Sequence, residues 1–181
     1  MTYPFSGNAV VSDDFNGHVS GRKNHNAWDV ADVEAATILA PEDGVHFSLF
    51  MLRSDKDVKK DHGTLPPEIR PYSWYFADRY GLCSILLAKD RWWLFAHCPV
   101  GEIGDMTKWR DNHNPAKFVE CYSRNYGPVT EGEALSRIGD TGFSTGPHCH
   151  MEITTPGYPG GYTGRLDPAK FWPDADMASP A

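Results

Sequence analysis

Residues 139–152 read GDTGFSTGPHCHME, a loop rich in glycine and threonine that runs into a His-x-His pair. If the residues after Pro147 are extended, side chains alternate between faces, so His148 and His150 point to the same side. Two imidazoles at the mouth of a turn can form part of a metal site or a proton-transfer pair. The alternative is a strand with two surface histidines. Spacing alone does not say which of the two would bind a metal.

A second cluster lies at His25 and Asp29, which are four residues apart. This spacing places both side chains on one face of a helix or a strand. A neutral imidazole and a carboxylate suit zinc, and His148 or His150 could supply a further ligand. A hydrogen-bonded His–Asp pair with a purely structural role explains the same motif.

A third cluster is the apolar run over residues 92–96 that ends at His97. Such a run predicts a buried strand that delivers one polar group at its end. Alone, His97 fits a hydrogen-bonded core histidine as well as a functional one. Three strand-like segments that each carry His or Asp at one end favour the functional interpretation.

Together these motifs resemble the lysostaphin-type (LytM-like) zinc metalloendopeptidases, which cut peptide cross-links in bacterial cell walls. The resemblance covers roughly residues 10–173 with gaps, and its most specific part is the His-x-His loop. Three further stretches match the family pattern: the turn LAPEDGV at 39–45, the lead VTEGEALSRIG at 129–139 and the closing LDP at 166–168.

The resemblance implies one Zn²⁺ ion bound by His25, Asp29 and His150, with His97 and His148 as the catalytic pair that does not bind metal. Two imidazoles and one carboxylate leave a fourth zinc position for water, whose pKa zinc lowers to about 7. We expect His148 to act as general base and His97 to stabilise the oxyanion, and these two roles are exchangeable.

The sequence departs from the family pattern at four positions near the site. Ala27 stands where the family has Gly, and Cys98, Cys149 and Met151 replace its usual aliphatic or aromatic residues. None of these changes removes a catalytic group, so we expect an active enzyme. On a strand Cys149 faces away from the two histidines, which indicates a small core residue.

The composition is that of a globular protein, with 181 residues, 40% hydrophobic and 23% charged side chains. We expect one domain over residues 1–181, with its core at about 10–173 and a flexible tail at 174–181. The 17 Gly and 14 Pro favour turns and short strands. The expected fold class is β-rich, and the resemblance implies an antiparallel β-sheet sandwich with an active-site groove and long loop insertions.

The expected elements are mostly strands, with one helix over residues 115–121 capped by Asn114. The strands are expected at 10–11, 29–33, 45–52, 72–76, 83–87, 91–96 and 149–154. Two stretches look like insertions, 54–71 and 101–128. The second is interpreted either as a wall of the substrate groove, with Trp109 or Tyr126 stacking on substrate, or as a self-packed loop.

The formal net charge of −7 argues against a nucleic-acid partner, and no apolar run is long enough to span a membrane. The N-terminal residues do not look like a signal peptide, and four cysteines without CxxC spacing indicate reduced thiols. The expected partners are stem or bridge peptides of peptidoglycan. We expect action at the cell wall (extracellular, periplasmic or virion-associated). Without a signal peptide the protein would have to reach the wall by another route, such as a phage or wall-targeting partner protein.

Three other functions compete with this interpretation. Two histidines and one carboxylate also form the facial triad of Fe(II) oxygenases, although His97 and His148 have no role there. A catalytically silent wall-binding or phage assembly module could keep the same fold. A zinc peptidase could instead act on proteins or free peptides. The remaining histidines, His18, His46, His62 and His113, are not expected to be catalytic, and His18 could contact the site indirectly.

Overall fold

A computed structural model describes residues 1–7, 9–17, 25–31, 36–51, 80–99, 107–109, 121–156 and 164–175. Within these ranges the regular structure consists of β-strands and one short 3₁₀ helix, and every strand pair is antiparallel. The β-rich antiparallel class predicted from the sequence is therefore confirmed. None of the described helices is long and apolar enough to cross a membrane.

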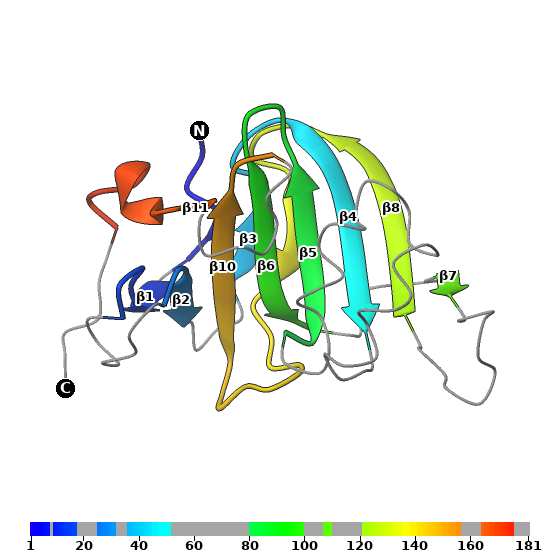
Figure 1. Ribbon diagram of the computed structural model, residues 1–181, viewed down its shortest axis with the longest axis horizontal. Helices are drawn as coiled ribbons and strands as arrows, with labels where there is room; N and C mark the ends of the chain where they lie inside the picture. Colours follow the sequence, from blue (N-terminus) through cyan, green and yellow to red (C-terminus); the bar gives the residue numbers. More distant parts are fainter. Residues whose placement is uncertain are drawn as a thin grey trace.

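The larger sheet carries most of the strands (Figure 1). In chain order they are β1 (Val10–Asp13), β2 (Trp28–Ala31), β4 (Gly44–Met51), β5 (Leu82–Leu87), β6 (Trp92–Cys98), β7 (Thr107–Trp109), β8 (Cys121–Val129), β10 (His148–Thr154) and β11 (Arg165–Leu166). Across the sheet the order is β1-β2-β10-β6-β5-β4-β8-β7, and β11 pairs with the last two residues of β10, Ile153 and Thr154. Strands distant in sequence, β2 and β10, thus become neighbours.

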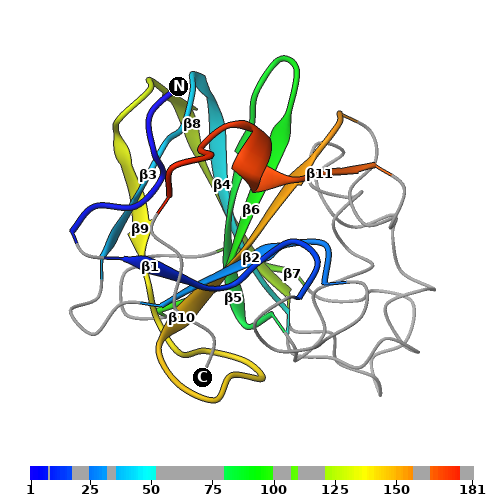
Figure 2. The same ribbon diagram turned by 90° about the vertical axis from the view of Figure 1, so that its left-hand side faces the viewer.

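A smaller sheet of β3 (Thr37–Leu39) and β9 (Ala134–Arg137) forms a second layer behind the large sheet (Figures 1 and 2). Ile38 of β3 and Ile138 after β9 belong to the same buried cluster as Trp93, Phe95 and Met151. The main core therefore lies between the two sheets, as in a sandwich, because each sheet has one apolar face to bury.

The C-terminal segment closes one end of this core. Asp167 caps the 3₁₀ helix η4 (Pro168–Lys170) by accepting a hydrogen bond from the Ala169 amide at 2.9 Å. The following Phe171 and Trp172 pack against the core, and Trp172 makes aromatic contacts with Trp93 and Trp28. Ala175 also packs there, and residues 176–181 of the expected tail lie outside the described residues.

Successive side chains of β10 point alternately into the core and toward the candidate site. Cys149, Met151 and Ile153 are fully buried in the core cluster, whereas His148 and His150 are carried on the opposite face. The prediction that Cys149 is a small core residue is confirmed. Like Cys149, Cys83 and Cys98 are buried free thiols, and burial raises the pKa of the Cys83 and Cys149 thiols.

Six of the seven expected strands are present, with ends shifted by one or two residues, and the expected strand at 72–76 lies outside the described residues. Five strands were not expected: β3, β7, β8, β9 and β11. The expected helix at 115–121 is wrong at Cys121, which begins β8, and its other residues lie outside the described ranges.

The interpretation of 101–128 as a loop insertion is likewise wrong for 107–109 and for 121–128, which pair with each other or with β4. The long edge of β4 explains β8, because eight residues of β4 pair with it despite the exposed polar side chains of Arg124 and Asn125. The insertion at 54–71 lies outside the described residues.

Gly81 provides a test of how tightly the sheet packs against the loop before β10. It has φ of +60°, and a Cβ atom there would lie 2.4 Å from Thr141. Gly132 has φ of +87° and open space around it. Gly81→Ala should therefore lower the free energy of unfolding by about 1–3 kcal/mol more than Gly132→Ala. Denaturant titration measures both, and equal losses would contradict this packing.

Candidate metal centre and active site

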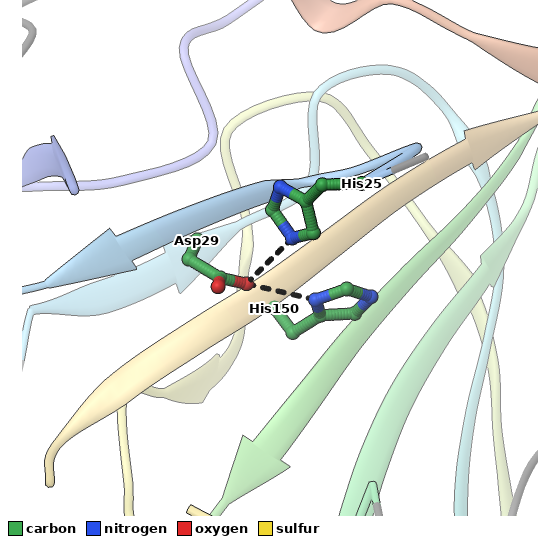
Figure 3. Close-up of side chains that lie close together, drawn as sticks. All are labelled: His25, Asp29 and His150. Atoms are coloured by element: carbon green, nitrogen blue, oxygen red, sulfur yellow. Dashed lines mark hydrogen bonds and ion pairs between the residues drawn. The ribbon is translucent and has the colours of Figure 1, made fainter. Parts of the chain in front are cut away.

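The pairing register between β2 and β10 places residues of both strands at the candidate centre. Asp29 lies directly opposite His150, and Val30 lies opposite Cys149. His25 stands just before β2 and reaches back over the same face (Figure 3). One donor atom from each of His25, Asp29 and His150 lies within 4.8 Å of the other two. The structure thus brings together the three residues that the resemblance implied as ligands.

Asp29 stands between the two histidines. Its Oδ1 lies 3.3 Å from His25 Nε2 and 2.8 Å from His150 Nδ1 (Figure 3). Burial opposes ionisation of this carboxyl, but the hydrogen bond and charge from His150, together with the nearby His25 ring, outweigh it and hold its pKa well below the usual range. Asp29 is therefore a carboxylate, and it needs positive charge beside it.

The hydrogen bonds of His25 determine which of its nitrogens is bare. Nδ1 lies 2.7 Å from the backbone oxygen of Asp14 and 3.4 Å from the Asp13 carboxylate. Because oxygen atoms of this kind only accept, Nδ1 carries the proton. In the neutral ring Nε2 is then a lone pair, and this atom is buried with no hydrogen bond. A buried nitrogen lone pair and a carboxylate oxygen that lie 3.3 Å apart are suited to bind the same cation as two of its ligands.

In His150 the two ring nitrogens have exchanged roles: Nε2 is the donor, and Nδ1 faces Asp29. Its Nε2 donates to Glu152 Oε1 at 3.0 Å, so the neutral ring presents a bare Nδ1 to Asp29. Burial lowers the pKa of His150, but the Asp29 and Glu152 carboxylates outweigh it and raise that pKa to about 9. Without a metal, a second proton on His150 therefore balances Asp29. The donor set of two ring nitrogens and one carboxylate oxygen fits a divalent cation in place of that proton.

His97 and His148 form a second pair beside this centre, with ring centroids 4.5 Å apart. His97 Nδ1 donates to the Thr141 carbonyl at 2.7 Å, and His148 Nδ1 donates to the Gly146 carbonyl at 2.8 Å. Both neutral rings consequently keep an unprotonated Nε2. Burial, helped by His148, lowers the pKa of His97 to about 4, so this ring is neutral at pH 7.

The backbone at His97 is strained to make this arrangement. His97 has φ of 63°, the left-handed region that non-glycine residues seldom occupy. Such a conformation costs about 1–3 kcal/mol and persists where surrounding contacts enforce it. The enforcing contacts are the Tyr80 carbonyl, which accepts from the His97 amide at 2.8 Å, and the Thr141 carbonyl on its ring.

A cavity of about 530 Å³ opens beside Asp29 and His148. Its walls come from β1, β2 and the loop before β10, and they include Ser12, Asp13 and Ala31 together with residues 143–147. Phe143 on this wall is 80% exposed. The described lining residues of this cavity include none from 101–128, the stretch interpreted as a possible groove wall.

Three residues at the centre were missed by sequence reasoning: Glu152, Tyr80 and Arg165. Glu152 accepts hydrogen bonds from His150 and from the Tyr80 hydroxyl, and it pairs with Arg165 at 2.9 Å. The signal for Glu152 was present, because it continues the period-two face of His148 and His150. Nothing local indicated Tyr80 or Arg165, which come from remote parts of the chain.

The other candidates of the sequence lie away from the centre or outside the described residues. His46 is buried, hydrogen-bonds Ser84 at 2.8 Å and stacks on Tyr126 at 4.5 Å. Tyr126 is on β8, which β4, β5 and β6 separate from β10. His18, His62 and His113 lie outside the described ranges, and nothing is described of the Trp109 side chain.

Comparison with known proteins gives similarity to solved structures only. No family model matches the chain, and no curated protein matches it. Csd3 of Helicobacter pylori matches at 16% identity and TM-score 0.46, over 99% of this chain and 33% of Csd3. The chain thus spans about a third of that protein.

Two further solved structures are similar at comparable levels. A mutant catalytic domain of EnpA, a prophage-encoded M23 protein of Enterococcus faecalis, matches at 18% identity and TM-score 0.42, over 93% of this chain and 92% of that one. The antimicrobial peptidase lysostaphin of Staphylococcus simulans matches at 15% identity and TM-score 0.44, over 94% and 53%. Each TM-score is below 0.5, so the function proposed below rests on this chain's own residues.

The state of His150 predicts proton release on metal uptake. With a pKa of about 9, His150 of the metal-free protein is doubly protonated at pH 7, and a metal binds only the unprotonated nitrogen. Binding of Zn²⁺ at pH 7 should release at least one proton, and apparent affinity should rise with pH up to about 9. Titration calorimetry in two buffers of different ionisation enthalpy measures the release. Binding heats that do not depend on the buffer would contradict it.

Proposed function

We propose that the chain is a zinc-dependent endopeptidase that hydrolyses peptide cross-links of bacterial peptidoglycan. His25, Asp29 and His150 would bind one Zn²⁺ ion, and His148 and His97 would be the catalytic pair. The observation that carries this proposal is the convergence of two ring nitrogens, one from His25 and one from His150, on one carboxylate oxygen of Asp29. The peptidoglycan substrate rests on the motif resemblance of residues 139–152.

Zinc bound by three protein ligands supplies a Lewis acid and a water of lowered pKa, which are the requirements of amide hydrolysis near neutral pH. The chain's own residues must then accept the water's proton and return a proton to the leaving amine. Two histidines next to the centre, outside the ligand set, have the chemistry for both steps.

His148 is suited to the role of general base. Its Nδ1–H is held by the Gly146 carbonyl, so Nε2 is the acceptor, and the ring lies on the cavity wall beside Asp29. Ser144 Oγ, 3.1 Å from the same Nδ1, restricts the ring further. Once Nε2 takes a proton, His148 becomes the donor that can return it to the leaving group.

His97 can stabilise an oxyanion only in a protonated state, because its neutral tautomer presents a bare Nε2. Burial disfavours that state in the resting protein. With the two rings 4.5 Å apart, like-charge repulsion favours one shared proton over two. We therefore assign the pair a single proton during turnover, which is carried first by the ring that acts as general base. The roles of general base and oxyanion stabiliser remain exchangeable between His148 and His97.

The proposed substrate is a peptide segment, for which the cavity of about 530 Å³ offers space beside Asp29 and His148. Carboxylates and apolar side chains share its walls, among them Asp13 and Phe143. We propose that the protein acts at the bacterial cell wall, brought there by a phage or wall-targeting partner.

Replacing the two groups of histidines separately tests the proposal. His148→Ala and His97→Ala should each lower the rate of wall hydrolysis by about 10²–10⁴-fold with zinc still near one ion per chain, because general catalysts contribute about that much. His25→Ala should lose both zinc and activity. Turbidity loss of purified walls and metal analysis are the measurements.

His46→Gln is the matched control, since His46 is buried away from the centre, and it should keep both zinc and activity. Chelation should stop the wild type, and added Zn²⁺ should restore it. Zinc loss in His148→Ala or His97→Ala would contradict the division of roles. Intact walls after exposure to zinc-loaded wild type would contradict the proposed substrate.

A further inference from the structure

The Glu152 carboxylate is a buried charge that the proposed catalytic steps do not use. It is 2% exposed, and its Oε1 is within 3.0 Å of three donors: His150 Nε2, the Tyr80 hydroxyl and the Arg165 guanidinium. Burying a carboxylate is costly unless its partners compensate, so this arrangement needs a reason. Its direct contact with His150 suggests one.

Arg165 connects Glu152 to the segment that carries His25. It lies on β11 opposite Thr154 of β10, and its side chain is 7% exposed. Its Nη2 is 2.9 Å from Glu152 Oε1, and its Nη1 donates to the Asn26 carbonyl at 3.3 Å. Asn26 follows His25 in the chain. One guanidinium therefore contacts both the strand that carries His150 and the segment that carries His25.

These contacts determine which nitrogen of His150 faces Asp29. An ionised carboxylate has no proton to donate, so Glu152 requires a proton on His150 Nε2 and leaves Nδ1 bare in the neutral ring. Arg165 places a second charged donor 2.9 Å from the same Glu152 oxygen and so holds the carboxylate in position beside the His150 ring.

We propose that Glu152 and Arg165 are positioning residues: Glu152 accepts from His150 Nε2 and so turns Nδ1 toward Asp29, and Arg165 holds the Glu152 carboxylate in place. Carboxylates beside metal-binding histidines fix the tautomer and ring orientation in this way. The inference rests on the proposed function, because it assigns these residues to the same zinc centre. The competing explanation is an ion pair that only holds β11 against β10.

The test is zinc affinity, measured by competition with a chromophoric chelator on the full chain. Glu152→Gln, of nearly the same shape, should raise the zinc Kd about 10–100-fold, the usual effect of losing such a partner. Arg165→Met should act in the same direction. Arg165→Lys should recover part of the loss, because the ammonium restores the charge but not the two-armed contact.

Arg91→Met is the matched control, because Arg91 also pairs with a carboxylate, Glu42, at 2.7 Å, away from the metal centre. It should leave the zinc Kd unchanged. The absorption spectrum of the Co²⁺-loaded protein gives a second readout, which should shift in Glu152→Gln and not in Arg91→Met. Circular dichroism verifies that the Gln variant is folded.

Equal zinc affinity and an unchanged Co²⁺ spectrum in Glu152→Gln would overturn the inference and leave the ion pair structural. If the Kd rises equally in Arg91→Met, the effect is general destabilisation, and the inference is also overturned. If wild type itself binds no zinc, the proposed function fails instead, so the two failures are distinguishable.

Discussion

The hydrogen-bonded register between β2 and β10 is the constraint on which the candidate site depends. It sets His150 opposite Asp29 on one face and Cys149 opposite Val30 on the other, where both are fully buried. A slip of one residue would move the histidines of β10 into the core and Cys149 to the site. The apolar side chains of β10 in the core cluster make such a slip costly, so burial on one face secures the chemistry on the other.

A second constraint is common to the four histidines of the site. In each ring one nitrogen is held by an oxygen acceptor: Asp14 O for His25, Thr141 O for His97, Gly146 O for His148 and the Glu152 carboxylate for His150. In the neutral form of each ring the other nitrogen is a lone pair. Three of these acceptors are backbone carbonyls, so the tautomers depend on where the chain passes rather than on further side chains.

The loop before β10 is positioned by Thr141, which ties it to two strands. Its hydroxyl donates to the Cys98 carbonyl at 2.7 Å and accepts from the Leu82 amide at 2.9 Å, while its own carbonyl holds His97. Gly139 permits the close approach, since a Cβ atom there would lie 2.5 Å from the His97 carbonyl oxygen. The strained φ of His97 is thus maintained by packing on both sides.

Local spacing predicted the side chains of the site better than their surroundings. The period of two at His148 and His150 and the four-residue spacing of His25 and Asp29 are visible in the sequence, because strand geometry acts over a few residues. That His25, Asp29 and His150 form one ligand set came from the resemblance, since pairing between strands distant in sequence leaves no local pattern.

For the same reason Arg165 and Tyr80 were missed, and so were β3 and β9, which are short and pair across a register shift. Strand β8 was mistaken for loop and helix because its exposed Arg124 and Asn125 and its Gly127 break the alternation that marks a strand.

The central claim is that three particular atoms, His25 Nε2, Asp29 Oδ1 and His150 Nδ1, converge on one divalent cation. A crystal structure of the zinc-loaded protein with anomalous scattering measured at the zinc edge tests it directly. The account predicts one strong peak at about 2.0–2.2 Å from each of these atoms. A peak bound through His150 Nε2, or located away from Asp29, would contradict it.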